Sequence, residues 1–383
     1  MNKPAVIIRG AYGESNFGDD VLMLISCDVV RRACPEHEVI LLFVSRVPES
    51  GYRYVQRMLP GLRIIHLESE AAADLVVWGG GTQFYSFAAT NVEVSKLTKI
   101  MRALFNPAKF MHYAKRLMYG NKFAADQRFA ALGVGIGPFV PGSSAESYSR
   151  RLFSGMDYIA VRDPASIELC NAWGCHGAQL RSDLAFLTDS WLGSIQLPDA
   201  VPGSVAIVVR DWPHSAAGTE LERSALKLAD QLRSQGRNVA FVLFRSSGDD
   251  RWEQILGERG EREILRWDPE QSSVHGFLAE LAKYETWVTA RYHGAIFGAI
   301  IGRNVIPVEL EPKLTMVAEL LNSPLWQSPF DADAAMKMID ASRSEEFDSN
   351  SNRTAAVEGQ KQAARQMIDE FSRFCRSESQ ARQ

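Results

Sequence analysis

Short apolar runs alternate along the chain with longer segments in which apolar residues recur at helical spacing. Such runs between helical segments predict buried parallel strands joined by crossover helices. In the first part of the chain the predicted strands are residues 5–8, 38–43, 62–66, 74–78, 129–134 and 158–161. In the later part they are residues 205–209, 238–244, 263–267 and 304–310, with one more ending at Val288. The pattern therefore predicts an α/β fold with parallel sheets.

A stretch with glycine, proline and serine, residues 192–203, interrupts this alternation and is the natural linker. We predict two doubly wound, Rossmann-like domains that face each other across a cleft, residues 1–192 and residues 204–330. Residues 331–383 are predicted to form C-terminal helices and a flexible tail. Pro307 favours an edge position for the last predicted strand, because proline has no backbone N–H to donate.

An arginine and a histidine follow one of the predicted strands directly. Arg291 and His293 lie between the strand ending at Val288 and a short apolar helix, residues 295–301. Ligands of open parallel sheets bind at the carboxyl ends of strands, beside helix N-termini. A guanidinium and a titratable imidazole at that point suit an anionic ligand that also exchanges a proton. Other arginines with the same placement after a strand are Arg162, Arg210 and Arg245.

Two more loops bring polar or glycine residues to strand ends. The loop after the first strand contains Asn16, Asp19 and Asp20, and it is not a phosphate-binding glycine loop. Asp19 or Asp20 at the helix start is a normal cap. After the strand at residues 74–78, the glycines of the segment GGGT predict a close backbone approach to a substrate or to the next helix.

Composition and charge limit the class of protein. The chain of 383 residues is 46% hydrophobic and 23% charged, which is ordinary for a soluble globular protein. A formal net charge of -4 gives no general attraction to nucleic acid. Five cysteines without a CxxC pair favour a reducing cytoplasm, and we expect neither a structural metal nor a secretory or membrane-spanning segment.

One segment departs from the acidic balance of the chain. Residues 95–122 contain seven lysines and arginines, no acidic residue, and apolar residues at helical spacing. Basic amphipathic helices are typical of a membrane interface or of a surface that binds a polyanion. A helical flap that packs on its own domain is an equally good interpretation. Contact with the inner face of a membrane through residues 95–122 therefore stays open.

Several motifs, taken in order, resemble those of the polysaccharide pyruvyl transferase family: NFGDD, GGGTQF, LGVGIGP, VRDPAS, SDLAFL and RYHGAIFGAIIGRNVIPVELEPK. The resemblance spans residues 10–321. It implies a fold like that of two-domain GT-B glycosyltransferases and transfer of the enolpyruvyl unit of phosphoenolpyruvate to a sugar, giving a pyruvate ketal. It marks Arg291 and His293 as residues for donor binding and catalysis. A further donor-binding arginine is implied, for which Arg162 and Arg210 are both candidates.

The implied chemistry assigns roles to these residues. Arginines can hold the phosphate and carboxylate of the donor by bidentate hydrogen bonds, and His293 as imidazolium can protonate the C3 methylene. Asp19 or Asp20 is the candidate base toward the acceptor, which we place on the N-terminal domain, with the donor on the C-terminal one. No cofactor is expected beyond the donor substrate. The remaining predicted substrate-binding residues are Asn16, Gly80, Gly81, Thr82, Gly294, Glu309 and Lys313.

Two other functions fit the same pattern. A GT-B nucleotide-sugar glycosyltransferase could use Glu309 for a ribose, and Arg291 with Lys313 for a pyrophosphate. A non-catalytic polysaccharide-assembly protein could be tethered through residues 95–122. The predicted partners are accordingly phosphoenolpyruvate and a saccharide acceptor, lipid-linked or free, but not nucleic acid.

Overall fold

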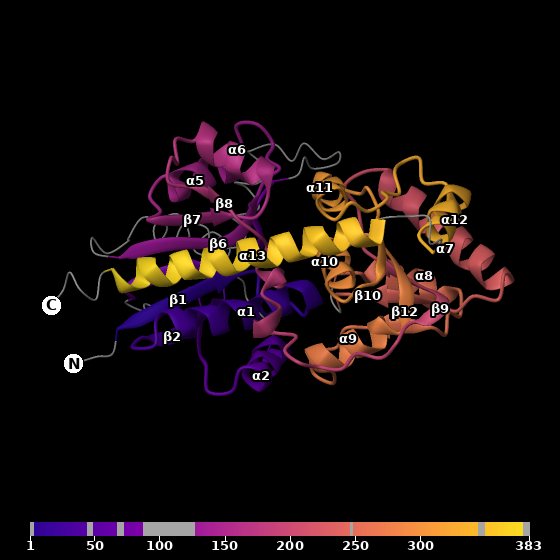
Figure 1. The fold of residues 1–383 in the computed structure, drawn as a ribbon, viewed down its shortest axis with the longest axis horizontal. Coiled ribbons are helices and arrows are strands. Elements are labelled where there is room, and N and C mark those ends of the chain that lie inside the picture. The colour runs from indigo at the N-terminus through magenta and orange to yellow at the C-terminus, as the bar shows by residue number, and fades with distance from the viewer. Residues whose placement is uncertain are drawn as a thin grey trace, which may run out of the picture.

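Two parallel sheets with helices on both faces form the two halves of the molecule (Figure 1). The computed structural model describes residues 4–43, 49–66, 73–86, 127–245, 248–343 and 349–377. The basic segment at residues 95–122 lies outside these ranges, so the predictions made for it have no structural outcome. The GT-B-like arrangement of two α/β halves is as the sequence predicted.

The first sheet has the strand order β3-β2-β1-β4-β6-β7-β8, with β5 paired to β6. Its strands carry continuous apolar runs because helices cover both faces; all four residues of β4 are buried. The elements of this half are β1 (Ala5–Gly10), α1 (Phe17–Ala33), β2 (Glu38–Phe43), α2 (Glu49–Met58), β3 (Arg63–His66), β4 (Leu75–Trp78), β5 (Gly81–Phe84), β6 (Arg128–Ile136), α5 (Ser144–Phe153), β7 (Tyr158–Val161), α6 (Pro164–Ala172) and β8 (Gln179–Leu180).

The second sheet has the order β11-β10-β9-β12-β13, and Pro307 ends its edge strand, as predicted. The expected linker is shorter than predicted, since β9 already begins at Val201. The elements are β9 (Val201–Val209), α7 (Ala217–Ser234), β10 (Val239–Leu243), α8 (Asp250–Glu258), β11 (Ile264–Arg266), α9 (Val274–Ala282), β12 (Tyr284–Thr289), α10 (Tyr292–Ile300), β13 (Asn304–Pro307), α11 (Pro312–Leu320) and α12 (Ala332–Ala341).

The last helix, α13 (Ser349–Arg376), runs from the second half back across the first (Figure 1). Tyr158 of β7 donates its hydroxyl hydrogen bond to the carbonyl of Met367, at 3.1 Å. Arg181 forms an ion pair with Glu370, with 2.7 Å between Nη2 and Oε1. The C-terminal helix thus packs on the domain that the N-terminal part of the chain builds.

Phe17, at the start of α1, joins the two halves. Its ring lies 4.8–5.3 Å from four rings of the second half, and its backbone N–H donates to the carbonyl of Phe244 at 2.9 Å. The four rings, which we call the aromatic socket, are Phe244, Trp267, Phe277 and Phe297. Because the socket is buried, one apolar core runs through both halves.

Replacing Phe17 by alanine is expected to lower the free energy of unfolding by about 3–5 kcal/mol, since it empties the aromatic socket. Urea unfolding followed by fluorescence measures this loss. The matched control is Phe139→Ala, because Phe139 is only partly buried and should cost clearly less. Equal losses for the two variants would contradict the role of Phe17 as the joint between the halves.

Candidate active site

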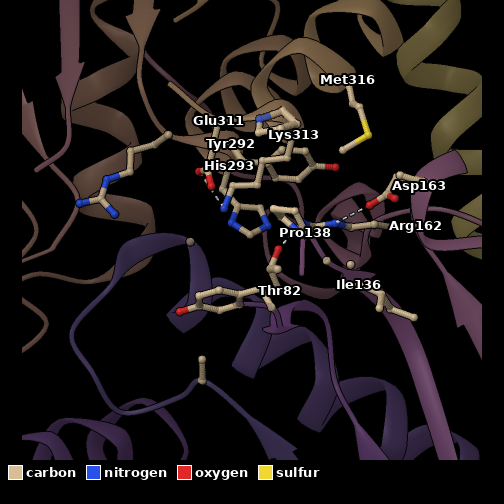
Figure 2. A pocket seen from close by; sticks show the side chains of 18 of the residues that line it. Thr82, Ile136, Pro138, Arg162, Asp163, Tyr292, His293, Glu311, Lys313 and Met316 are labelled. Atoms are coloured by element: carbon tan, nitrogen blue, oxygen red, sulfur yellow. Dashed lines mark hydrogen bonds and ion pairs between the residues drawn. The ribbon is translucent and has the colours of Figure 1, made fainter. Parts of the chain in front are cut away.

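A cavity of about 550 Å³ lies between the carboxyl ends of the two sheets (Figure 2). Its wall brings together residues that are far apart in the sequence, from Ala11 to Met316. Eight of the predicted site residues line it: Asn16, Asp19, Thr82, Arg162, Arg210, Arg291, His293 and Lys313. Arg245, the other arginine noted after a strand, lines it as well, and its Nη2 is 2.7 Å from Glu14 Oε2.

The turn between β12 and α10 places the arginine and the histidine. The helix begins at Tyr292, three residues earlier than predicted, so Arg291 is its N-cap and His293 lies in its first turn. Thr289 Oγ1 accepts from the N–H of Arg291 at 3.1 Å and donates to its carbonyl at 3.0 Å. A side chain at position 294 would meet Thr289 Oγ1 at 2.3 Å. Gly294, predicted to bind substrate, therefore serves the turn and does not line the cavity.

A buried carboxylate holds the guanidinium of Arg291. Nη2 donates to both carboxylate oxygens of Asp249, whose side chain is 0% exposed. Burial lowers the pKa of Arg291, Asp249 acts in the opposite direction, and Arg210 adds to the lowering. With a side chain that is 11% exposed, Arg291 offers a partly desolvated positive charge to the cavity.

The same arrangement recurs with Glu311 at the N-cap of α11. The buried carboxylate of Glu311 accepts from Arg210 and lies 3.0 Å from Lys313 Nζ. Burial lowers the pKa of Lys313 to about 8, although Glu311 opposes the shift. Lys313 therefore loses its proton in the mildly alkaline range, and an anion in the cavity would favour its charged form.

Arg162 is held on more than one side. Nη1 donates to Asp183 Oδ2 at 2.8 Å, Nη2 donates to Thr82 Oγ1 at 2.6 Å, and the guanidinium lies 4.1 Å from the centre of the Tyr292 ring. A side chain at Gly135 would meet the guanidinium at 2.8 Å, so the glycine makes room for it. Of the two candidate donor-binding arginines, Arg162 already has protein partners for both terminal nitrogens, and Arg210 is the more exposed.

His293 lies between the two halves. Nε2 is 3.4 Å from Asp183 Oδ2, and the ring is stacked on Phe297 with 5.8 Å between centroids. Its Nδ1 edge faces the first turn of α1, where a side chain at Gly18 would come within 2.5 Å of Nδ1. Only glycine at position 18 leaves the imidazole in this place, which explains the glycine in the NFGDD segment.

The structure separates the two candidate bases of α1. Asp19 lines the cavity and its Oδ2 accepts from Asn16 Nδ2 at 2.5 Å. Burial raises the pKa of Asp19, with His293 as the main opposing charge. Asp20 is fully buried away from the cavity, where it accepts from the Tyr54 hydroxyl at 2.9 Å and from Trp267 Nε1 at 2.7 Å. The prediction of Asp20 as a catalytic base is wrong in its placement, because both of its oxygens serve the junction between the halves.

Three more predicted substrate-binding residues do not line the cavity. Gly80 packs against Leu22 and Leu184, and Gly81 has a φ of +106° beside Asp19. Glu309 accepts a hydrogen bond from the Thr315 hydroxyl at 3.1 Å. These glycines bring the start of β5 close to α1, a helix earlier in the chain, and not to the next helix that one interpretation of the GGGT segment expected.

Within the described ranges, no three His, Cys, Asp or Glu side chains are grouped so that they could hold a metal ion. None of the helices in these ranges combines the length and apolar character needed to cross a bilayer.

Solved structures of low sequence identity share the fold. MnaA from S. aureus, in a co-structure with UDP, has a TM-score of 0.59 and 10% identity over 97% of both chains. A UDP-GlcNAc 2-epimerase from Neisseria meningitidis has a TM-score of 0.55 and 9% identity over 96% of this chain and 98% of that one. The wall teichoic acid polymerase TagF has a TM-score of 0.50 and 12% identity, over 99% and 90%. At these identities the likeness shows the GT-B-like fold alone.

Sequence comparison identifies the family. No curated protein matches the chain. A sequence model described as polysaccharide pyruvyl transferase matches residues 16–312, a span that starts at Asn16 in the cavity wall and ends beside Glu311. The match includes the second sheet, every described strand of the first sheet except β1, and the arginine-histidine turn. The chain belongs to the polysaccharide pyruvyl transferase family.

Proposed function

We propose that the protein transfers the enolpyruvyl unit of phosphoenolpyruvate to a saccharide, forms a pyruvate ketal and releases phosphate. The observation that carries this proposal is the clustering of Arg210, Arg291 and Lys313 around His293 in one cavity. Phosphoenolpyruvate presents a phosphate and a carboxylate, and partly desolvated cations hold such groups more strongly than exposed ones. The cavity volume of about 550 Å³ is within the range of small-molecule sites.

Buried acids support the assignment of the donor to the cavity wall that the second half of the molecule forms. Asp249 fixes Arg291, and Glu311 fixes Arg210 and Lys313, so the cations are positioned before the donor arrives. A preorganised set of charges loses little freedom on binding. The donor then adds negative charge beside Lys313, which favours its protonated form.

His293 is the candidate general acid in the reaction. It gives a proton to C3 of the donor, and the electrons of the C2=C3 double bond form the new C3–H bond. A hydroxyl oxygen of the acceptor bonds to C2. The C2–O bond to phosphate then breaks, with its electron pair leaving on the phosphate. The oxygen of a second hydroxyl of the same sugar bonds to C2, loses its proton to solvent and closes the ketal. General acid catalysis of this kind typically contributes about 10²–10⁴-fold.

The wall from the first half suits the acceptor. Asp19 has a pKa raised by burial, which is favourable for a base that takes the proton of a sugar hydroxyl. Tyr85 lines the cavity with 47% of its surface exposed and offers an aromatic face to a sugar ring. We place the reaction in the cytoplasm, with a saccharide that is lipid-linked or free as the acceptor.

A thermal-shift comparison tests the donor. Phosphoenolpyruvate should raise the melting temperature, since a ligand at a hundredfold excess over Kd stabilises the native state by about 2.7 kcal/mol. UDP- and GDP-sugars are the matched alternatives and should produce no shift. A shift with nucleotides only would point to a glycosyltransferase and overturn the proposal. Binding of phosphoenolpyruvate without phosphate release in the presence of lipid-linked oligosaccharides would point to a non-catalytic role.

A further inference from the structure

Asp183 connects the two sides of the cavity. It follows β8 in the first half, and its Oδ2 is shared between Arg162 Nη1, at 2.8 Å, and His293 Nε2, at 3.4 Å. The sequence pattern placed Asp183 only in the SDLAFL segment and gave it no role. Its contact with His293 joins a residue of the first half to one of the second.

The carboxylate of Asp183 is rigidly held. Its side chain is 1% exposed, and Oδ1 accepts from the backbone N–H of Ala185 at 2.9 Å, which caps a short 3₁₀ turn. Burial alone would raise the pKa of Asp183, but His293 and Arg162 lower it to about 2. Asp183 therefore stays negatively charged over the whole range in which enzymes of this kind are assayed.

The imidazole has a different environment at each nitrogen. Nε2 faces Asp183, and Nδ1 faces Gly18 at the wall of the cavity. Asp19 is the other acid close enough to interact with the ring. Other charged groups act on these two acids: Arg162 on Asp183, and Lys313, Arg245 and Glu14 on Asp19.

We infer that Asp183 is a positioning residue for His293: it accepts the Nε2–H and so leaves Nδ1 as the nitrogen that delivers the proton. This inference rests on the proposed function. In the imidazolium both nitrogens carry protons; the Nδ1–H bond breaks, its electrons stay on nitrogen, and the proton bonds to C3 of the donor. The neutral ring then keeps its Nε2–H on Asp183, and solvent reprotonates Nδ1 before the next turnover. The 3.4 Å separation is in keeping with catalytic hydrogen bonds that tighten when the substrate binds.

The variant Asp183→Asn tests the inference because it keeps the shape of the side chain and removes its charge. We expect kcat to fall about 10²-fold, with KM for phosphoenolpyruvate changed much less. Loss of the negative charge beside the imidazole should also move the basic limb of the pH–kcat profile to lower pH. Nitrogen-15 NMR of the histidines should show the Nε2–H tautomer of His293 in the wild type at high pH and a mixture in the variant.

The matched control is Asp163→Asn. Asp163 Oδ2 is 3.6 Å from Arg162 Nε, so this variant also weakens the surroundings of the arginine but does not touch His293. It should leave the pH limb and the tautomer in place. A lower kcat in Asp183→Asn with neither of these two readouts changed would assign Asp183 a structural role only and overturn the inference.

The NMR arm separates this inference from the proposed function, because it needs no turnover. Suppose that the wild-type protein does not turn over phosphoenolpyruvate, but His293 changes from one tautomer to a mixture in Asp183→Asn. That result would refute the proposed reaction and still support the inference that Asp183 positions the imidazole. If Asp183→Asn does not fold, the wild-type spectrum still decides. An Nδ1–H tautomer of His293 at high pH would overturn the inference.

Discussion

Replacing His293 by alanine is expected to lower pyruvate transfer about 10³-fold or more while the protein stays folded. His293 is the imidazole in the cavity wall formed by the described residues, and no other group there is placed between Asp183 and Gly18. Transfer of labelled pyruvate from phosphoenolpyruvate to an oligosaccharide acceptor measures the loss, and the melting temperature reports on the fold.

Two further variants make this result specific. His176→Ala removes an exposed histidine that does not line the cavity, and it should keep full activity. His293→Gln retains a polar side chain of similar reach but supplies no proton, so it should be as inactive as the alanine variant. Full activity of His293→Ala would remove this histidine from the mechanism.

Replacing Arg291 by lysine should lower kcat/KM for phosphoenolpyruvate about 10²-fold, equivalent to about 2.7 kcal/mol of transition-state stabilisation. The guanidinium uses Nη2 for Asp249 and Nε for the carbonyl of Val209, which leaves Nη1 for the donor. An ammonium group keeps the positive charge beside Asp249 but cannot serve both partners with a planar fork. The substitution thus avoids leaving a buried carboxylate without a partner, which would destabilise the protein.

Steady-state kinetics with varied phosphoenolpyruvate would measure this effect. Arg266→Lys is the control, since Arg266 also forms a side-chain ion pair, with Glu253, but lies on the surface. It should leave both kcat and KM unchanged. A KM for Arg291→Lys equal to that of the wild type would show that Arg291 does not hold the donor.

The sequence predicted the sheets and the cationic side of the cavity well, because both depend on local order along the chain. Apolar runs locate strands, and a residue directly after a parallel strand lies at the edge where ligands bind. This local rule is sufficient to bring Arg291, His293 and Arg210 to one place. It says nothing about which acid will meet each cation.

The partners of these cations required the structure. Asp249 meets Arg291 from a loop that follows a different strand, and Asp183 reaches His293 from the other half of the molecule. Asp19 and Asp20 could not be told apart in the sequence, since both lie in the first turn of α1. Successive helical residues point about 100° apart, so one faces the cavity and the other the junction.

The first turn of α1 contributes both to the junction between the two halves and to the wall of the cavity. Phe17 fills the aromatic socket, Gly18 lies against the His293 ring and Asp19 lines the cavity, all within three consecutive residues. A chimera that takes its C-terminal half from a relative must therefore inherit rings able to receive Phe17. If the rings of the new C-terminal half do not fit Phe17, Gly18 would shift relative to the imidazole. Such a chimera would lose turnover before it lost solubility. Acceptor preference can be exchanged safely only by grafting loops that leave this turn and its rings intact.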